Sequence, residues 1–350
     1  MSLMPLSVVD ALTAAGLVPV PRSGEDPRSI VVDLYDSTPG PRRVATLEVR
    51  RLSGSPTPGT LERLAARSRR STGREGTGLL VVCDHASSGA LRRADELGIS
   101  LVGLEPAQVP HPAGGIRLGP GRLLPLGPRV PVHPYRETRR ASWAPVQVLR
   151  SRVLLGRLTQ RDVAALAGIS QPRVAQAAAA LGLVDDEPRS LLVDRWLDAY
   201  PGAGGVTTYW FGLSPPREQA RAAVRAARQV GPADVVVSGD VAADVVAPVS
   251  RPVRAVVYSR QGLDLTAAGL TPSLSSEATL ELTVPQDRGI FAFADRYWHS
   301  TDTRRPAEDL PLADPLQVLH DVRRSPSVDR DQSDEAMRRF LARADARDEE

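Results

Sequence analysis

The segment from Thr159 to Gln176 constrains this chain most, because its pattern predicts two short helices joined by a sharp turn. Thr159 is a good N-cap for the first helix, and Gly168 can end that helix because glycine adopts the left-handed backbone of a C-terminal cap. Ser170 is placed to cap the second helix, with Pro172 in its first turn, where a missing backbone N–H costs little. Together these signals predict a helix-turn-helix.

The second helix of this segment divides into an apolar face and a polar face. Val174 and Ala177 recur at helical spacing and are expected to face the core. The residues expected to face outward are Gln171, Arg173 and Gln176. Arginine can bridge O6 and N7 of guanine, and glutamine can bridge N6 and N7 of adenine. This helix is therefore predicted to contact base edges in the major groove of double-stranded DNA. The residues expected to contact phosphates are Thr159, Gln160 and Ser170.

The flanks of the helix-turn-helix predict the rest of a small domain. A further helix is expected before it, beginning near Pro145, and Leu183 and Val184 are expected to start the strand of a wing. The next residues are acidic, namely Asp185, Asp186 and Glu187. Because that charge repels phosphate, the helix rather than the wing is expected to contact DNA. An alanine-rich hairpin that only packs, and a winged helix that binds protein, are the alternatives.

Composition excludes several kinds of chemistry. The chain has 350 residues, enough for two or three domains, and all 44 of its Lys-plus-Arg positions are arginine. The absence of lysine excludes a Walker A loop and a Schiff-base site, and it weakens the case for a restriction-type nuclease triplet. The only cysteine, Cys83, is expected in a buried strand, which leaves no internal disulfide or multi-cysteine zinc site. Without a signal peptide or a membrane-length apolar run, the protein is expected to be cytoplasmic.

Four segments follow from the alternation of periodic stretches with stretches rich in proline and glycine. Residues 1–105 predict an α/β domain, and residues 106–141 predict an extended connector. Residues 142–188 hold the winged helix-turn-helix, and residues 189–345 predict a mixed α/β domain. The connector ends in Arg136, Arg139 and Arg140. These arginines are expected either to grip DNA as a basic arm or to be charges on a solvated linker.

Apolar runs predict specific elements in the two α/β domains. In the first, helices are expected at 8–15, 61–70 and 88–97, and strands at 30–35, 44–52, 79–83 and 99–102. In the second, helices are expected at 191–200, 217–230, from 241, at 316–322 and at 336–344, and strands at 207–211, 235–237, 255–258, 280–284 and 290–293. The outer face of the 217–230 helix carries Arg217, Arg221, Arg225 and Arg228. Such a stripe is more often a solvated face than a binding surface.

Asp33, Glu48 and Arg50 resemble the constellation of a restriction-type nuclease. Such enzymes place an Asp on one strand and an Asp/Glu-x-Lys on the next, where they hold a divalent ion and orient water. Period two puts Glu48 and Arg50 on one face, as this chemistry requires. Arginine stays protonated, however, and cannot replace the lysine as a tuned proton donor. We expect a nuclease-like fold without turnover, and the alternative is that Glu48 and Arg50 form a simple surface ion pair.

Ser238-Gly239-Asp240 follows a buried strand and precedes a helix, as the triphosphate-binding turn of nucleotidyltransferases does. Those enzymes also need two carboxylates on the following strand to bind metal. That strand, 254–259, has no acidic pair, so a transferase-like fold without catalysis is expected. The five histidines are scattered without metal-ligand spacing. We therefore expect no metal, no cofactor and no catalytic residue.

Several segments together resemble the AbiEi-type antitoxins of type IV toxin–antitoxin systems. The segments that carry the resemblance are 81–88, 94–99, the helix-turn-helix, 195–201, 238–243 and 313–319. The resemblance implies an N-terminal restriction-endonuclease-like domain, a central winged helix and a C-terminal antitoxin domain of nucleotidyltransferase-like character. It also implies an autorepressor that counters a nucleotidyltransferase-like toxin. The acidic wing and the proline-rich connector depart from the family pattern.

The expected function is that of a sequence-specific DNA-binding regulator, not an enzyme. A homodimer on an inverted-repeat operator is the expected assembly, with a cognate toxin as a further partner and no membrane association. The main alternative is a metal-dependent nuclease that uses Asp33 and Glu48 and is targeted by the winged helix. A protein-interaction scaffold is a third hypothesis, which weak or salt-independent DNA binding would favour.

Overall fold

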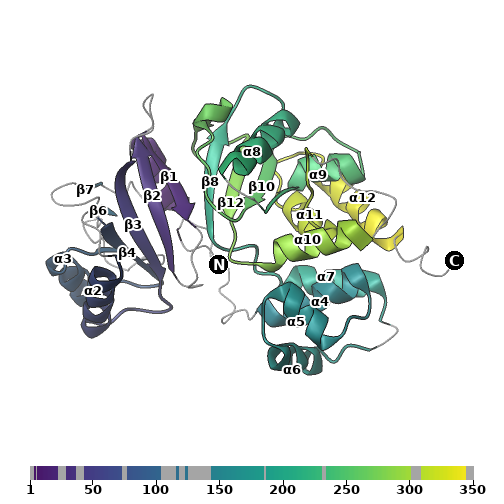
Figure 1. Ribbon diagram of the computed structural model, residues 1–350, viewed down its shortest axis with the longest axis horizontal. Helices are drawn as coiled ribbons and strands as arrows, with labels where there is room; N and C mark the ends of the chain where they lie inside the picture. The colour runs from purple at the N-terminus through teal and green to yellow at the C-terminus, as the bar shows by residue number, and fades with distance from the viewer. Residues whose placement is uncertain are drawn as a thin grey trace.

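The computed structural model describes residues 4, 6–22, 29–36, 43–72, 77–103, 116–117, 123–124, 143–184, 187–230, 234–300 and 309–343. Within these residues it contains two five-stranded mixed sheets, a two-stranded ribbon and twelve α-helices, which confirms the α/β class. Figure 1 shows one sheet in each of two lobes, with a separate group of helices beneath the second sheet. No helix in the described part of the chain is both long enough and apolar enough to span a bilayer.

The N-terminal lobe is a mixed sheet covered by helices. Its elements are α1 (Leu6–Ala14), β1 (Leu17–Arg22), β2 (Ser29–Asp36), β3 (Arg43–Arg51), α2 (Pro58–Thr72), β4 (Thr77–Cys83), α3 (Ser88–Glu96) and β5 (Ser100–Gly103). The strands follow the order β1-β2-β3-β4-β5, antiparallel from β1 to β3 and parallel from β3 to β5. The parallel pairs need crossover connections, which α2 and α3 provide. A short ribbon of β6 (Ile116–Arg117) and β7 (Leu123–Leu124) follows.

Strand β4 is buried on both of its faces. Leu80 and Val82 belong to the core that includes α1, whereas Val81 and Cys83 belong to the core beneath α2 and α3. Burial on both faces explains the continuous apolar run that predicts this strand. The position of Cys83 inside the strand confirms the prediction made for it.

The central group contains α4 (Trp143–Leu155), α5 (Gln160–Ala167), α6 (Gln171–Leu181) and α7 (Arg189–Ala199). These bounds confirm the predicted helix-turn-helix and the helix before it. Leu183 and Val184 lie in no strand, so the predicted start of a wing is wrong. The chain continues from α6 into α7 without pairing these residues to a neighbour strand, and strand propensity alone cannot form a strand without a partner.

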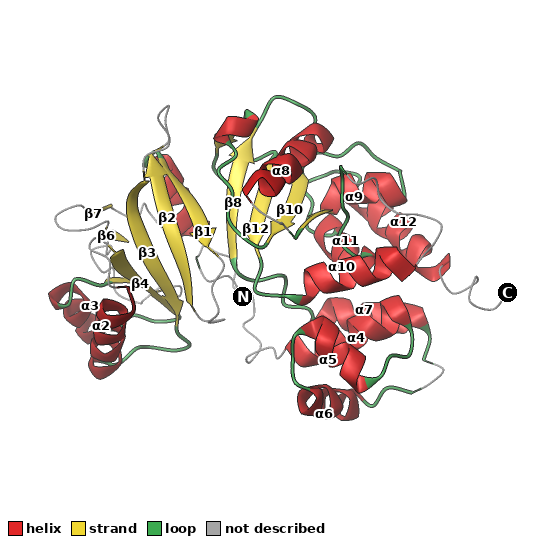
Figure 2. Cartoon of the chain, viewed as in Figure 1, coloured by secondary structure: helices red, strands yellow, loops and turns green. Residues whose placement is uncertain are grey.

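The C-terminal lobe has its sheet order β11-β8-β12-β10-β9. Its elements are β8 (Val206–Phe211), α8 (Pro216–Val230), β9 (Val235–Ser238), α9 (Gly239–Val246), β10 (Ala255–Ser259), the 3₁₀ turn η1 (Thr266–Ala268), β11 (Thr271–Pro272), β12 (Leu280–Val284), α10 (Gly289–Ser300), α11 (Pro315–Val322) and α12 (Arg330–Arg343). Only β10 and β12 are parallel, and the other neighbouring pairs are antiparallel. Helix α8 packs across the sheet, and α9 to α12 gather beside its β9 edge (Figure 2).

The strand predicted at 290–293 is instead the first turn of helix α10. Ile290, Phe293 and Tyr297 are buried at helical spacing, so their core face has a period that a strand cannot provide. The carboxylate of Asp287 accepts a hydrogen bond of 2.9 Å from the Gly289 N–H and starts the helix. The closing helix α12 also begins earlier than predicted, at Arg330 rather than near Ala336.

Strand β1 is not among the predicted elements, because Pro19 and Pro21 interrupt its pattern. Proline is tolerated there since β1 is the edge strand of its sheet and needs no N–H on that side. The carbonyl of Pro21 instead accepts a hydrogen bond of 2.6 Å from the Gly262 N–H, which belongs to the C-terminal lobe. Asp10 similarly accepts one from the Ser275 N–H at 3.2 Å. The two lobes therefore meet where β1 lies beside β8 (Figure 2).

Candidate nucleic-acid interface

The two helices of the helix-turn-helix are bounded by the residues that the sequence predicts. Thr159 Oγ1 accepts a hydrogen bond of 3.2 Å from the Asp162 N–H, and Gly168 ends α5 with a φ of 63°. Ser170 is the N-cap residue of α6 by its backbone angles, but its hydroxyl makes no capping hydrogen bond. The prediction that Ser170 is the cap residue is confirmed, and Pro172 lies in the first turn as expected.

Helix α6 buries one face and exposes the other. Val174 and Ala177 are 2% and 6% exposed and pack against α4 and α5, as predicted. The exposed residues of the opposite face include Gln171, Arg173 and Gln176. Thr159, Gln160 and Ser170 are exposed as well. All six described residues that were predicted to contact DNA are thus accessible on the helix-turn-helix.

Of the three acidic residues that follow α6, the structure describes only Glu187. Glu187 is turned inward, with its side chain 7% exposed and its Oε1 atom 2.5 Å from Nη1 of Arg195. Its charge is therefore compensated inside the protein. Asp185 and Asp186 lie outside the described residues. The basic arm of Arg136, Arg139 and Arg140 also lies outside them, so its role stays a prediction.

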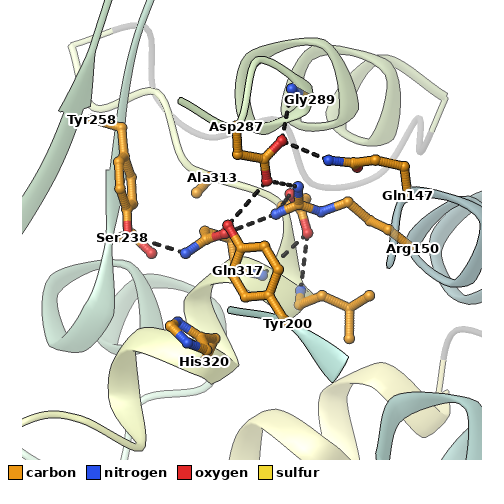
Figure 3. Close-up of polar contacts among 12 residues, drawn as sticks. Gln147, Arg150, Tyr200, Ser238, Tyr258, Asp287, Gly289, Ala313, Gln317 and His320 are labelled. Carbon is orange, nitrogen blue, oxygen red and sulfur yellow. Dashed lines mark hydrogen bonds and ion pairs between the residues drawn. The ribbon is translucent and has the colours of Figure 1, made fainter. Parts of the chain in front are cut away.

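A buried polar cluster fixes α4 to the C-terminal lobe, at the back of the helix-turn-helix (Figure 3). Arg150 on α4 is fully buried and donates to Asp287 Oδ2 at 2.9 Å and to Gln317 Oε1 at 2.8 Å. Gln147, one turn earlier, donates to Asp287 Oδ1 at 2.6 Å. Tyr200, directly after α7, donates to Asp287 at 3.0 Å. One carboxylate thus ties α4 and the end of α7 to the start of α10.

The charge of Arg150 is balanced by carboxylates that are themselves buried. Asp314 Oδ2 lies 3.2 Å from Nη2 of Arg150. Burial opposes the charged form, but Asp314 and Asp287 outweigh it and raise the pKa of Arg150. Burial likewise raises the pKa of Asp314, and Arg150 counteracts that shift. The guanidinium also lies 5.3 Å from the ring centroid of Trp196, which adds a cation–π contact.

The same cluster continues to the glycine turn of the C-terminal lobe. Gln317 Nε2 donates to the hydroxyl of Tyr258 at 3.0 Å, and that hydroxyl donates to Asp321 at 2.9 Å. The Ser238 hydroxyl also donates to Asp321, at 2.6 Å. Burial alone would raise the pKa of Asp321, but hydrogen bonds from His320 and Ser238 lower it. A continuous set of polar contacts therefore links α4 to Ser238.

The glycine turn is closed rather than open to a ligand. Gly239 has a φ of 61°, and a Cβ atom there would lie 2.9 Å from Val256 Cγ2. Ser238 is fully buried, and its hydroxyl is occupied by Asp321. Strand β10 carries no acidic pair, as the sequence indicates. Its Tyr258 instead donates a hydrogen bond to Asp321 on α11.

Asp33 on β2 and Glu48 on β3 lie on the same face of the N-terminal sheet, but each has its own partners. Arg22 pairs with Asp33. Arg50 Nη2 lies 2.6 Å from Glu48 Oε1, and Ser68 on α2 donates to Glu48 Oε2 at 2.5 Å. The Glu48–Arg50 pair exists but is buried beneath α2, so the alternative of a simple surface pair is wrong. In the described ranges, no three acidic, histidine or cysteine side chains are arranged to hold a metal ion.

In the arginine stripe on α8, Arg217 and Arg221 are engaged in ion pairs. Arg217 lies 3.6 Å from Asp244, and Arg221 lies 2.8 Å from Asp309 and also pairs with Glu218. These contacts compensate the charge locally. They fit the solvated face that the sequence favours better than a surface for DNA.

Sequence reasoning missed Arg150, Gln147, Asp287 and Gln317, which carry the junction between the helix-turn-helix and the C-terminal lobe. The sequence held one signal, because the segment of α4 has polar residues on the same turns as its apolar residues. In the structure, nine of the thirteen residues of α4 are buried. A helix buried on nearly all sides must find partners for such groups. Their identity could not be inferred, since the partners come from distant segments.

Comparison with protein-family models, with curated proteins and with solved structures gives no significant match. The resemblance to AbiEi-type antitoxins is therefore neither supported nor contradicted by known relatives. Any function assigned to the chain has to come from its own geometry.

Proposed function

We propose that this chain is a sequence-specific DNA-binding regulator of the antitoxin type, which contacts its operator through α6. The proposal depends on one observation above all: Gln171, Arg173 and Gln176 are exposed on a helix whose other face is buried. In the major groove, arginine recognises guanine and glutamine recognises adenine through paired hydrogen bonds. The residues proposed to contact phosphates are Thr159, Gln160 and Ser170.

The support behind α6 is rigid, which favours recognition of sequence over loose attachment. Base discrimination needs side chains held in one position, because each paired hydrogen bond tolerates shifts of only about 0.5 Å in distance and about 10–20° in angle. Arg150, Gln147 and Tyr200 all converge on the buried carboxylate of Asp287. We propose that this junction makes the C-terminal lobe a fixed platform for the helix-turn-helix.

The C-terminal lobe is proposed to serve regulation rather than catalysis. A nucleotidyltransferase needs an open glycine turn and two carboxylates on the next strand. Here Ser238 is buried, and β10 lacks an acidic pair. This favours the antitoxin role that the resemblance implies, in which a homodimer on an inverted repeat represses its own operon and a cognate nucleotidyltransferase-like toxin is the further partner.

Selection of bound sequences from a random DNA library tests the proposal. The full chain is expected to enrich one motif at physiological salt, and Arg173→Ala is expected to lose discrimination at one base pair of that motif, by about 1–3 kcal/mol. Arg251→Ala is the matched control, because Arg251 is an exposed arginine in the loop after α9 and the substitution removes the same charge. The proposal fails if the native chain enriches no motif, or if Arg173→Ala leaves the motif unchanged.

A further inference from the structure

The C-terminal end of α6 is held by a side chain from the next helix. The last carbonyls of a helix have no partner within it, so they need another donor. Nη2 of Arg195, on α7, donates to the carbonyl of Leu181 at 2.6 Å. Leu181 is the last residue of α6, and a cation at this end of a helix also interacts favourably with its dipole. Arg195 thus caps the helix that carries the proposed base contacts.

The same guanidinium holds the segment that connects α6 to α7. Nη1 of Arg195 lies 2.5 Å from Oε1 of Glu187, and the Glu187 side chain is 7% exposed. An ion pair that is mostly shielded from water is screened less by salt than one on the surface. Because Arg195 uses two donors for two acceptors, it fixes the end of α6 and the following segment together.

Helix α7 is itself fixed on either side of Arg195. Asp194 accepts a hydrogen bond of 2.7 Å from Arg338 on α12. Trp196 is fully buried and stacks on Tyr200 with ring centroids 4.3 Å apart. The position of Arg195 is therefore set by the C-terminal lobe. The inner face of α6 packs through Val174 and Ala177, with Leu181 partly buried against the same core.

We propose that Arg195 is a positioning residue for DNA recognition, which takes the place of a wing in holding α6 at its angle to the C-terminal lobe. The inference rests on the proposed function. Leu183 and Val184, where a wing strand was expected, lie in no strand, although Leu183 packs against the core that α6 shares with α4 and α5. Through Arg195, the C-terminal lobe determines where the distal half of the recognition helix lies in the groove.

Loss of this contact has a graded consequence along α6. Gln176 is five residues from Leu181, or about 7.5 Å along the axis, whereas Arg173 is eight residues, or about 12 Å, from it. The N-terminal end of α6 remains held by the turn at Gly168. The base contact of Gln176 should therefore be lost before that of Arg173. A purely structural defect would weaken both contacts alike.

The experiment compares base discrimination, position by position, for the full chain and two arginine variants. Gln176→Ala and Arg173→Ala first identify the base pair that each side chain contacts. Arg195→Met is then expected to reduce discrimination about tenfold at the Gln176 position and no more than about twofold at the Arg173 position. Arg251→Met is the matched control, since Arg251 is an exposed arginine in the loop after α9 and belongs to neither α6 nor α7, and it should leave both positions unchanged.

Arg195→Lys extends the test if Arg195→Met does not fold. Lysine keeps the charge but cannot reach Leu181 and Glu187 with the two separate nitrogens of a guanidinium. An intermediate loss of discrimination confined to the Gln176 position is therefore expected. Equal losses at both positions, or no loss in either variant, would overturn the role of Arg195 while leaving the proposed function standing. If the native chain shows no base discrimination at all, the proposed function fails first and this inference with it.

Discussion

Replacing Arg150 by methionine should destabilise the junction between the helix-turn-helix and the C-terminal lobe. Methionine has a similar length and fills the site, so the main loss is the charge. Asp287 and Asp314 would be left buried, with 1% and 0% of their side chains exposed, and without their shared cation. Removal of one member of a buried ion pair costs about 3–5 kcal/mol. For the helix-turn-helix and the C-terminal lobe unfolding together, about 200 residues, that is a decrease in Tm of roughly 6–20 °C.

The loss should depend on pH, and its sign follows from Asp314. Burial raises the pKa of Asp314 above its ordinary value of 3.8, and Arg150 is the group that counteracts this shift. Without Arg150 the pKa rises further in the folded state. A carboxyl group whose pKa is raised on folding lowers the free energy of unfolding at pH values above its ordinary pKa. That cost disappears as the pH falls towards the ordinary pKa. The difference in Tm between the native chain and Arg150→Met should therefore shrink between pH 7.5 and pH 4.5.

Differential scanning calorimetry at several pH values measures both effects. Arg225→Met, at an exposed position of α8, is the control for loss of one arginine. Arg150→Met combined with Asp314→Asn should recover part of the loss, because asparagine keeps the N-cap of α11 while removing one buried charge. A decrease in Tm below about 2 °C at pH 7.5 would refute the reasoning. A decrease that does not change with pH would refute the role of the carboxyl groups.

Two further predictions concern other parts of the chain. Gly239→Ala should destabilise the protein by about 1–3 kcal/mol, because its Cβ would lie 2.9 Å from Val256 and its φ is 61°. Gly98 has a φ of 69° and open space around it, so Gly98→Ala should cost only the backbone strain. Equal losses in the free energy of unfolding for the two variants would contradict the proposed clash at Gly239. Burial raises the pKa of Cys83 to about 11, so a thiol reagent at pH 8 should label it slowly in the native protein and rapidly in guanidinium chloride. Rapid labelling of the native chain would show that the β4 core opens readily.

Several features of the candidate interface could be predicted from the sequence because they depend on neighbours in the chain. The cap at Thr159 and the end of α5 at Gly168 are decided within three or four residues. The exposed face of α6 follows from the helical period alone, which is why Gln171, Arg173 and Gln176 were predicted to be outward. The strands whose apolar runs are buried on both faces, such as β4, were similarly predictable.

Other elements were decided by contacts that local patterns do not contain. Ile290 and Phe293 suit a strand or a helix equally, and the choice fell to the core against which α10 packs. Pro19 and Pro21 argue against a strand, yet β1 forms because it occupies a sheet edge beside the C-terminal lobe. Leu183 and Val184 lie in no strand, because a strand needs a partner strand and neither residue pairs with one within the described residues.

The sequence by itself determined which face of α6 is exposed, because periodicity and capping act over a few residues. Only the tertiary structure decided what holds that surface in place. Arg150 meets Asp287 across 137 residues and Gln317 across 167 residues, and no local pattern indicates which distant partner will compensate a buried charge. The physical reason is that an unpaired charge inside a protein is too costly to remain, so the fold must supply its partner wherever that partner lies in the chain.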